Sequence, residues 1–271
     1  MSVSSPNIVY LAINLPSSIE RREHMMSEGQ KHGINIQIVE AVSGKTLTPE
    51  QKAMYNSRMR ESMYINHLSP NEQACVHSHR KALQAILDSQ ADYGVILEDD
   101  AVLEQNFIQG IHYLIDSVNG WECCKLYTEP SKLYPVCPNI PDAPVQPVFP
   151  KKIPWGAIAY MYSRKAATEI LAHFDNFWLG ADTHLAEIML THNIPVIGIT
   201  PNLVTTLYVQ NEQSDIDEGG SRYSDKISTK RSALQYLRYR ASVGMRAFKK
   251  WKMRVRLRWI LSVKANAAES K

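Results

Sequence analysis

Three consecutive carboxylates, Glu98, Asp99 and Asp100, are the residues whose types and spacing most directly indicate chemistry. They follow a short apolar run, residues 93–97, which predicts a buried parallel strand that delivers the acids to the carboxyl edge of a sheet. Open α/β folds bind ligands at that edge. Neighbouring carboxylates repel one another, and a divalent cation among them relieves the repulsion. The triplet therefore predicts a metal site; the alternative is that Asp99 or Asp100 only caps the next helix.

The elements that must position these acids fit one α/β domain, or one domain with a small extension. The chain has 271 residues, 44% of them apolar, which is enough to bury a sizeable core. Nothing in it resembles a repeat array. Its first residues lack the basic and apolar regions of a signal peptide, and no later segment is long enough to span a bilayer. We therefore expect a cytoplasmic protein, soluble or peripheral on a membrane.

The four cysteines form neither a metal pattern nor a disulfide pattern. They lack the spacing of a zinc site, and two of them are adjacent, which is a poor start for a disulfide framework. The four are Cys75, Cys123, Cys124 and Cys137. We expect reduced thiols in the core.

Charge is distributed unevenly along the chain, although the formal net charge is only +3. Residues 230–264 carry 12 Lys or Arg and no acid, which leaves 18 basic and 27 acidic residues elsewhere, a balance of −9. An acidic body with a basic tail predicts a polyanionic surface as partner. We expect a catalytic domain over residues 1–225 and a basic amphipathic helical tail over residues 226–271.

The first forty residues have the pattern of a β-α-β unit. Residues 7–14 form an apolar run suited to a central first strand. A helix should follow, with a capping box formed by Ser17 and Glu20 and a stop at Gly33. Residues 34–39 then predict a second strand, which completes the unit.

The junction between the first strand and the first helix of such a unit faces the ligand crevice. Arg21 and Arg22 lie in the first turns of the predicted helix. A guanidinium at this position can reach a phosphate or a nucleotide base. The alternative for either residue alone is solvated helix surface.

A second helix is indicated from Ser69 to about residue 90. Ser69 is followed by proline at the first helical position and by Glu72 at the third, which is a capping box. One face carries a core stripe at helical spacing. The stripe is Cys75, Val76, His79, Ala82, Leu83 and Ile86. We expect a buried His79 that hydrogen-bonds a neighbour, since His77 and His79 point in different directions and cannot share a metal.

Several short segments occur in an order that is more specific than any one of them. The sharpest is Leu-Ser-Pro-Asn-Glu-Gln-Ala-Cys-Val-His-Ser-His at residues 68–79, followed by Val-Ile-Leu-Glu-Asp-Asp at residues 95–100. The others are Ile13-Asn14-Leu15 with Arg21-Arg22, Trp155-Gly156-Ala157-Ile158-Ala159-Tyr160, Leu179 to Leu185 around Asp182, and Gln210 with residues 214–216. Together they cover roughly residues 7–217 and resemble glycosyltransferase family 25, the lipooligosaccharide biosynthesis glycosyltransferases.

The resemblance implies an α/β fold of the GT-A-like kind, a Rossmann-type mixed sheet flanked by helices, here with a basic C-terminal helical extension. It also implies an inverting transferase that moves a hexose from a UDP-sugar, galactose first and glucose next. Mn²⁺ or Mg²⁺ would be held by Asp100 and Glu98, where a hard cation neutralises the charge that develops on the leaving diphosphate. The implied UDP-sugar site consists of Asn14, Leu15, Arg21, Arg22, Ser78, His79 and Asp99.

An inverting displacement also needs a base that removes the proton of the acceptor hydroxyl. Asp182 is the candidate that the resemblance implies, at the start of a helix predicted over residues 182–192; the alternative is a helix N-cap. The implied acceptor and sugar site consists of Trp155, Gly156, Tyr160 and Gln210. The aromatic residues among these can stack on sugar rings, and the alternative is that they only fill the core.

Residues 126–150 are rich in proline and are therefore predicted to form neither a long helix nor a central strand. A loop of this length in a compact domain is usually functional. We expect a wall or lid beside the acceptor site, with disorder as the alternative.

The basic tail interleaves apolar residues with Lys and Arg, a pattern typical of helices that lie on an anionic membrane surface. The apolar residues are Tyr236, Leu237, Val243, Phe248, Trp251, Val255, Leu257, Trp259 and Ile260. We expect a peripheral location on the inner face of the bacterial cytoplasmic membrane, where the resemblance places a lipid-linked oligosaccharide acceptor. The alternatives are a solvated tail and nucleic-acid binding, and we expect no nucleic acid as partner.

Two other function classes remain open. A metal-dependent phosphohydrolase also places acids after a strand, but it usually sets a nucleophilic Asp after the first strand, and residues 8–15 end without one. A non-catalytic membrane-binding or nucleic-acid-binding protein explains the tail and leaves the acidic triplet without a role.

Overall fold

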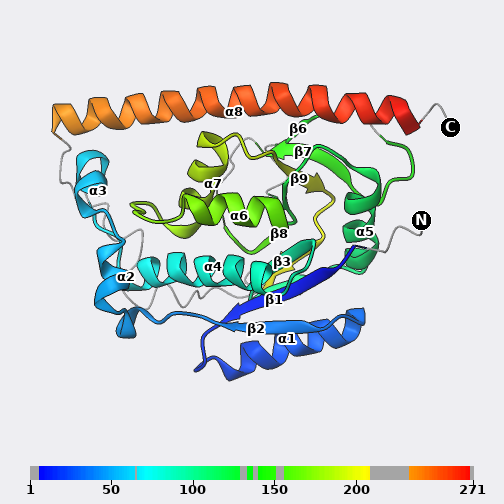
Figure 1. Cartoon of the computed structure of the whole chain (residues 1–271), viewed down its shortest axis with the longest axis horizontal. Coiled ribbons are helices and arrows are strands. Elements are labelled where there is room, and N and C mark those ends of the chain that lie inside the picture. The colour runs from blue at the N-terminus through cyan, green and yellow to red at the C-terminus, as the bar shows by residue number, and fades with distance from the viewer. Residues whose placement is uncertain are drawn as a thin grey trace.

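The computed structural model describes residues 6–64, 66–128, 133–136, 140–150, 156–207 and 232–268. Its centre is an eight-stranded mixed sheet with helices packed against it (Figure 1). In spatial order the strands are β2 (Ile36–Glu40), β1 (Ile8–Asn14), β3 (Tyr93–Glu98), β8 (Ala159–Ser163), β5 (Cys123–Lys125), β9 (Val196–Thr200), β7 (Gln146–Pro150) and β6 (Leu133–Pro135). A separate two-stranded ribbon pairs β10 (Val204–Thr206) with β4 (Ala101–Leu103).

The helices of the described chain vary greatly in length. They are α1 (Ile19–His32), α2 (Pro49–Ala53), α3 (Ser57–Met63), α4 (Pro70–Asp88), α5 (Phe107–Ser117), α6 (Arg164–Ala172), α7 (Ala181–Thr191) and α8 (Ala233–Ala268), with a short 3-10 turn over Gly44–Thr46. The expected α/β class, a mixed sheet flanked by helices with a basic C-terminal helix, is confirmed.

Strand direction gathers the predicted site residues at one edge of the sheet. β1 is parallel to both β2 and β3, so their carboxyl ends meet, and Ile13 is paired with Glu98. β8 is antiparallel to β3, with Leu97 opposite Ala159, so β8 begins where β3 ends. One edge of the sheet therefore holds the end of β1, the acidic triplet and the segment before β8.

The predicted helix signals are confirmed at α4 and only partly at α1. Ser69 and Glu72 form both hydrogen bonds of a capping box at the start of α4. The capping box predicted for α1 is wrong, because its N-cap is Ser18, whose side chain makes no capping bond. Gly33 ends α1 as expected, with a φ of 66° that glycine adopts without a steric cost.

The prediction that residues 126–150 form no central strand is wrong for β7, which pairs with β9 on one side and with β6 on the other. Residues 146–148 pair with β9 and residues 148–150 with β6, so only Val148 pairs on both sides. Each proline of β7 therefore faces a single neighbouring strand, where a missing N–H is tolerated. The expected role as a lid stays a prediction.

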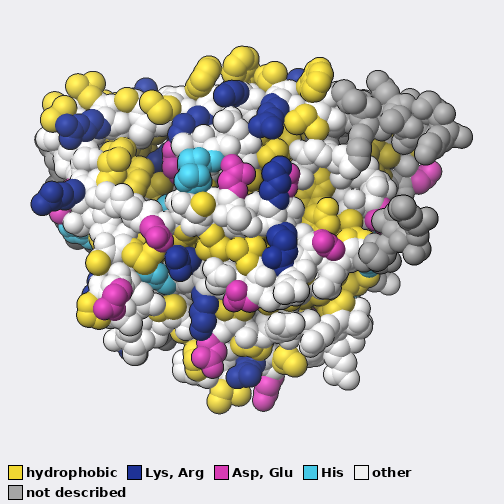
Figure 2. Space-filling model, in the orientation of Figure 1, with side chains coloured by type: hydrophobic (Ala, Val, Ile, Leu, Met, Phe, Trp, Pro, Cys, Tyr) yellow, Lys and Arg dark blue, Asp and Glu magenta, His cyan; other side chains and the backbone are white. Residues whose placement is uncertain are grey.

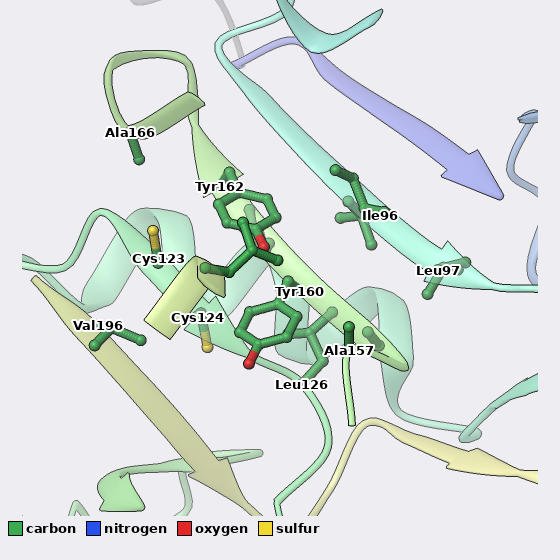
Figure 3. Packing of buried hydrophobic residues seen from close by; sticks show 14 of the residues in the cluster. Ile96, Leu97, Cys123, Cys124, Leu126, Ala157, Tyr160, Tyr162, Ala166 and Val196 are labelled. Carbon is green, nitrogen blue, oxygen red and sulfur yellow. The ribbon is translucent and has the colours of Figure 1, made fainter. Parts of the chain in front are cut away.

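The core contains two stacked tyrosines beside buried thiols (Figure 3). Tyr160 and Tyr162 of β8 have ring centroids 5.7 Å apart and are almost completely buried. Cys123 and Cys124 of β5 are buried free thiols, and burial raises the pKa of both. The expectation of reduced core thiols is confirmed for these two residues, whereas Cys137 lies outside the described residues.

The C-terminal helix α8 runs along one whole side of the molecule, at the top of Figure 1. It contacts α3 and α7. Met253 and Leu257 are buried in the common core, so α8 is packed onto the body and is not a free tail. Among the described residues, no helix is both long and apolar enough to cross a membrane. The boundary between residues 1–225 and 226–271 stays a prediction.

Replacing His184 with glutamine is expected to change how stability depends on pH. The His184 Nε2 lies 2.8 Å from the Phe174 carbonyl oxygen, and burial lowers the pKa of His184 below its ordinary 6.5. The unfolded chain therefore binds a proton more readily than the folded chain, and stability is lost as the pH falls below 6.5. Glutamine keeps an N–H donor and has no such titration.

This prediction is checked by chemical denaturation of both proteins on either side of pH 6.5. The wild-type free energy of unfolding should fall relative to that of His184→Gln as the pH drops. His67→Gln is the matched control, because His67 is an exposed histidine at 53% side-chain exposure. An equal pH response of the wild type and His184→Gln would contradict the prediction.

Candidate active site

Asp99 is held by two residues from the β1–α1 junction. The Asn14 Nδ2 donates to Asp99 Oδ2 at 2.8 Å, and the Arg21 guanidinium donates to Asp99 Oδ1 at 3.1 Å. Burial raises the pKa of Asp99, and the bonds from Asn14 and Arg21 only partly offset this effect. The same Asn14 amide also donates to the Ser18 carbonyl oxygen at the start of α1. The predicted pair of Asn14 and Arg21 is therefore brought to the triplet.

Asp100 carries a buried oxygen without a hydrogen-bond partner. Its Oδ2 accepts from Thr206 Oγ1 of β10 at 2.8 Å, whereas its Oδ1 is buried and unsatisfied. Burial, followed by the charges of Glu98 and Asp99, raises the pKa of Asp100 to about 6. A buried carboxylate oxygen without a donor is costly on its own, and a cation is a partner that would satisfy it.

Glu98 faces the buried His79 of α4, with 3.6 Å between His79 Nε2 and Glu98 Oε1. Burial alone would lower the pKa of His79, but interactions with the neighbouring Cys75 and Glu98 side chains outweigh it and raise the pKa to about 10. Glu98 therefore lies beside an imidazolium. Within the described part of the chain, no three His, Cys, Asp or Glu side chains form a ready-made metal site. Asp100 is therefore a better candidate than Glu98 for binding a cation. A cation bound there would need additional coordinating oxygens from a bound substrate.

Asp182 is the second residue of α7, whose N-cap is Gly180, so Asp182 is not the cap. Its Oδ1 accepts from Thr183 N at 2.6 Å, and its Oδ2 accepts from Gly156 N at 3.3 Å. The N-terminal end of a helix stabilises a carboxylate. Asp182 is thereby fixed beside the segment that enters β8.

Tyr160 and Gly156 lie with Asp182. The Tyr160 hydroxyl is buried and has no hydrogen-bond partner. Burial raises the pKa of Tyr160, and the charge of Asp182 raises it further. Gly156 has a φ of 75°, a conformation that favours glycine, and its N–H is the one that Asp182 binds. The predicted residues Asp182, Tyr160 and Gly156 therefore lie close to one another. Trp155 and Gln210 lie outside the described residues.

The remaining residues of the predicted donor site are not brought to the triplet by a contact. Arg22 is exposed on α1, and Leu15 is half-buried with its carbonyl oxygen bonded to Ser18 N. Ser78 is buried, donates to the Ala74 carbonyl oxygen at 2.8 Å and accepts from Val42 N at 2.8 Å. It therefore fixes the segment after β2.

Two residues beside the site were not predicted. Thr206, which donates to Asp100, comes from a three-residue strand with no sequence signal. Lys125 is buried at the end of β5, with its Nζ 5.7 Å from the centre of the Tyr160 ring. Lys125 stands between two short apolar pairs, Cys123-Cys124 and Leu126-Tyr127, so no sequence signal distinguished it.

The fold and the site define an α/β protein whose candidate site lies at the carboxyl ends of adjacent parallel strands. Residues 7–135 match the model of glycosyltransferase family 25 (LPS biosynthesis protein). This match confirms the resemblance over these residues. The matched residues include Asn14, Arg21 and the acidic triplet.

Procollagen galactosyltransferase 2 of Homo sapiens is 28% identical over 145 residues, covering 48% of this chain and 23% of the relative. The Mus musculus protein of the same name is 27% identical with the same coverage. The chain therefore spans only 23% of the length of each of these two relatives.

Two solved structures are similar at the level of the backbone. A glycosyltransferase involved in the glycosylation of the major capsid of PBCV-1 is 13% identical, with a TM-score of 0.43, covering 79% of this chain and 98% of that chain. A197 from STIV is 13% identical, with a TM-score of 0.40, covering 73% of this chain and 83% of that chain.

Proposed function

We propose that this protein is an inverting, metal-dependent glycosyltransferase that moves a hexose from a UDP-sugar to a lipooligosaccharide or LPS core acceptor. The observation that carries the proposal is the buried, unpartnered Oδ1 of Asp100 at the strand ends that also hold Asp99. The match of residues 7–135 to the model of glycosyltransferase family 25 supports transfer of a sugar. The names of the relatives support galactose as the first donor sugar, with glucose next.

On the donor side, Asp100 would hold Mn²⁺ or Mg²⁺ through Oδ1, with Glu98 as the second candidate ligand. A bound divalent cation supplies neutralisation of the charge on the leaving nucleoside diphosphate. Asn14 and Arg21 orient Asp99 and favour its ionised form, so its oxygens can accept bonds from the hydroxyls of the ribose or the donor sugar. Arg22, Leu15 and Ser78 have no role in this scheme.

On the acceptor side, Asp182 serves as the base that takes the proton of the attacking hydroxyl. The backbone N–H groups of Thr183 and Gly156 fix its carboxylate and leave lone pairs available. Proton transfer to a base on the face opposite the leaving group is what an inverting displacement requires. The buried Tyr160 hydroxyl beside it can donate to an acceptor oxygen.

The acceptor is proposed to be lipid-linked. The description of the family as LPS biosynthesis protein and the basic helix α8 support this assignment. A procollagen acceptor belongs to the named relatives, whose matched part is 23% of their length.

The proposal is tested by measuring UDP release from UDP-galactose and UDP-glucose with and without Mn²⁺. We expect release to be fastest with UDP-galactose, to stop when EDTA is added and to return with Mn²⁺. GDP-mannose is the control donor and should give no release. With an acceptor present, NMR should show a β-linked product from the α-linked donor. The proposal would be overturned if no nucleotide sugar binds and none is turned over with Mn²⁺ or Mg²⁺. Release of inorganic phosphate instead of UDP would indicate a phosphohydrolase.

A further inference from the structure

The outward side of α8 carries a continuous apolar stripe. Its members recur at helical spacing and are exposed: Leu234, Leu237, Ala241, Met245, Phe248, Val255 and Trp259. The exposed fraction is 64% for Leu237, 61% for Phe248 and 73% for Trp259. Figure 2 shows hydrophobic side chains gathered along the top edge of the molecule, where α8 lies. Apolar side chains of this size rarely stay exposed in a row on a protein that has no partner.

The opposite side of α8 is fixed to the body. Arg246 and Lys249 both bind Glu187 of α7, at 3.0 and 2.8 Å, and Met253 and Leu257 continue the same side into the core. These residues recur at spacings of three or four, so they lie on one face of the helix. Their burial forces the apolar stripe to face away from the body, and the helix cannot turn to hide it.

Cations accompany the stripe. Arg238, Arg240 and Lys252 are exposed on α8, next to its apolar residues in the sequence. Residues 230–264 contain 12 Lys or Arg and no acid, so the helix supplies no carboxylate of its own to neutralise them. A row of large apolar side chains flanked by cations is complementary to the acyl boundary and the phosphates of an anionic bilayer.

We propose that this face of α8 docks on an anionic lipid bilayer, with the helix lying in the plane of the headgroups. The helix has 36 residues and a length of about 54 Å, so it would present a long edge of the body to the membrane. A nucleic acid would bind the cations but would leave Leu237, Phe248 and Val255 in water. The role of this docking, which is to meet a lipid-linked acceptor, rests on the proposed function. The docking itself requires no enzymatic activity.

The test is flotation of the 271-residue chain with two kinds of vesicle, phosphatidylcholine alone and an equal mixture of phosphatidylcholine and phosphatidylglycerol. We expect binding to the anionic vesicles only. Phe248→Ser/Trp259→Ser should reduce this binding at least tenfold by removing apolar anchors. Arg240→Gln/Lys252→Gln should reduce it roughly thirtyfold, at about 1 kcal/mol for each cation. The matched control is Ile19→Ser/Met26→Ser, which removes two exposed apolar side chains from α1 and should bind as the wild type does.

Circular dichroism and UDP release from UDP-galactose keep the outcomes distinct. Both should be unchanged in the α8 variants, since the altered side chains are exposed and outside the proposed catalytic residues. If UDP release is absent in every protein while vesicle binding follows the pattern above, the docking stands and the proposed function fails. Unchanged vesicle binding by both α8 variants would overturn the docking. So would a dimer that dissociates in Phe248→Ser/Trp259→Ser, or binding to duplex DNA in preference to anionic vesicles.

Discussion

Asp182→Asn is expected to lower the rate of glycosyl transfer by about 10²–10⁴-fold, the range typical of losing a general base. Asparagine has nearly the same shape and keeps an oxygen that can accept from Thr183 N or Gly156 N, so the start of α7 should stay in place. It cannot take the proton of an acceptor hydroxyl. Donor binding should therefore be unchanged, because this carboxylate belongs to the acceptor side of the site.

The measurement pairs initial rates of transfer from UDP-galactose to a deacylated LPS core oligosaccharide with calorimetric titration of UDP in the presence of Mn²⁺. Asp175→Asn is the matched control, because Asp175 is an exposed carboxylate, at 67% side-chain exposure, shortly before α7. It should transfer at the wild-type rate. Transfer by Asp182→Asn at the wild-type rate would remove Asp182 as the base.

Asp100→Asn is expected to weaken metal-dependent donor binding by at least about a hundredfold, more than is usual for losing a residue that only supports a metal ligand. The asparagine can still bind Thr206, but the position of the unpartnered Oδ1 no longer carries a negative charge. Without metal, the variant should be at least as stable as the wild type, since it removes one of three neighbouring carboxylates from a partly buried site.

This expectation is measured by titrating UDP into each protein with Mn²⁺ and with EDTA, alongside thermal unfolding of the metal-free proteins. Asp92→Asn is the control at the opposite end of β3, where the Asp92 carboxylate accepts from the exposed Asn7 N–H. It should bind UDP with the same metal dependence as the wild type. If Asp100→Asn also keeps that dependence, Asp100 is not a metal ligand.

Local signals predicted the first part of the fold well. The capping box at Ser69 and the glycine stop at Gly33 act within one helical turn, so the sequence contains the whole interaction. The order of the strands was not predictable in this way. β8 lies between β3 and β5, antiparallel to both, and only long-range pairing decides that. The strand character of β7 was hidden because its prolines are tolerated only through the particular neighbours it has.

The same contrast between local signals and long-range contacts applies to the residues of the candidate site. Asn14 and the acidic triplet follow apolar strands that the sequence shows, so their meeting at one sheet edge could be predicted. Thr206 lies 106 residues from Asp100, in a strand of three residues, and no local pattern connects them. Ser78 illustrates the opposite problem. Its place in a specific motif predicted a donor-binding residue, but its side chain makes two hydrogen bonds to the backbone.

The helix α7 joins two parts of the molecule through a single rigid element. Asp182 lies at its beginning, and Glu187, which holds Arg246 and Lys249 of α8, lies five residues later, about 7.5 Å along the axis. With α8 on a bilayer, this short helical segment, and not a flexible linker, would connect the proposed base to the docked helix. The proposed base would then stay at one constant distance from the lipid.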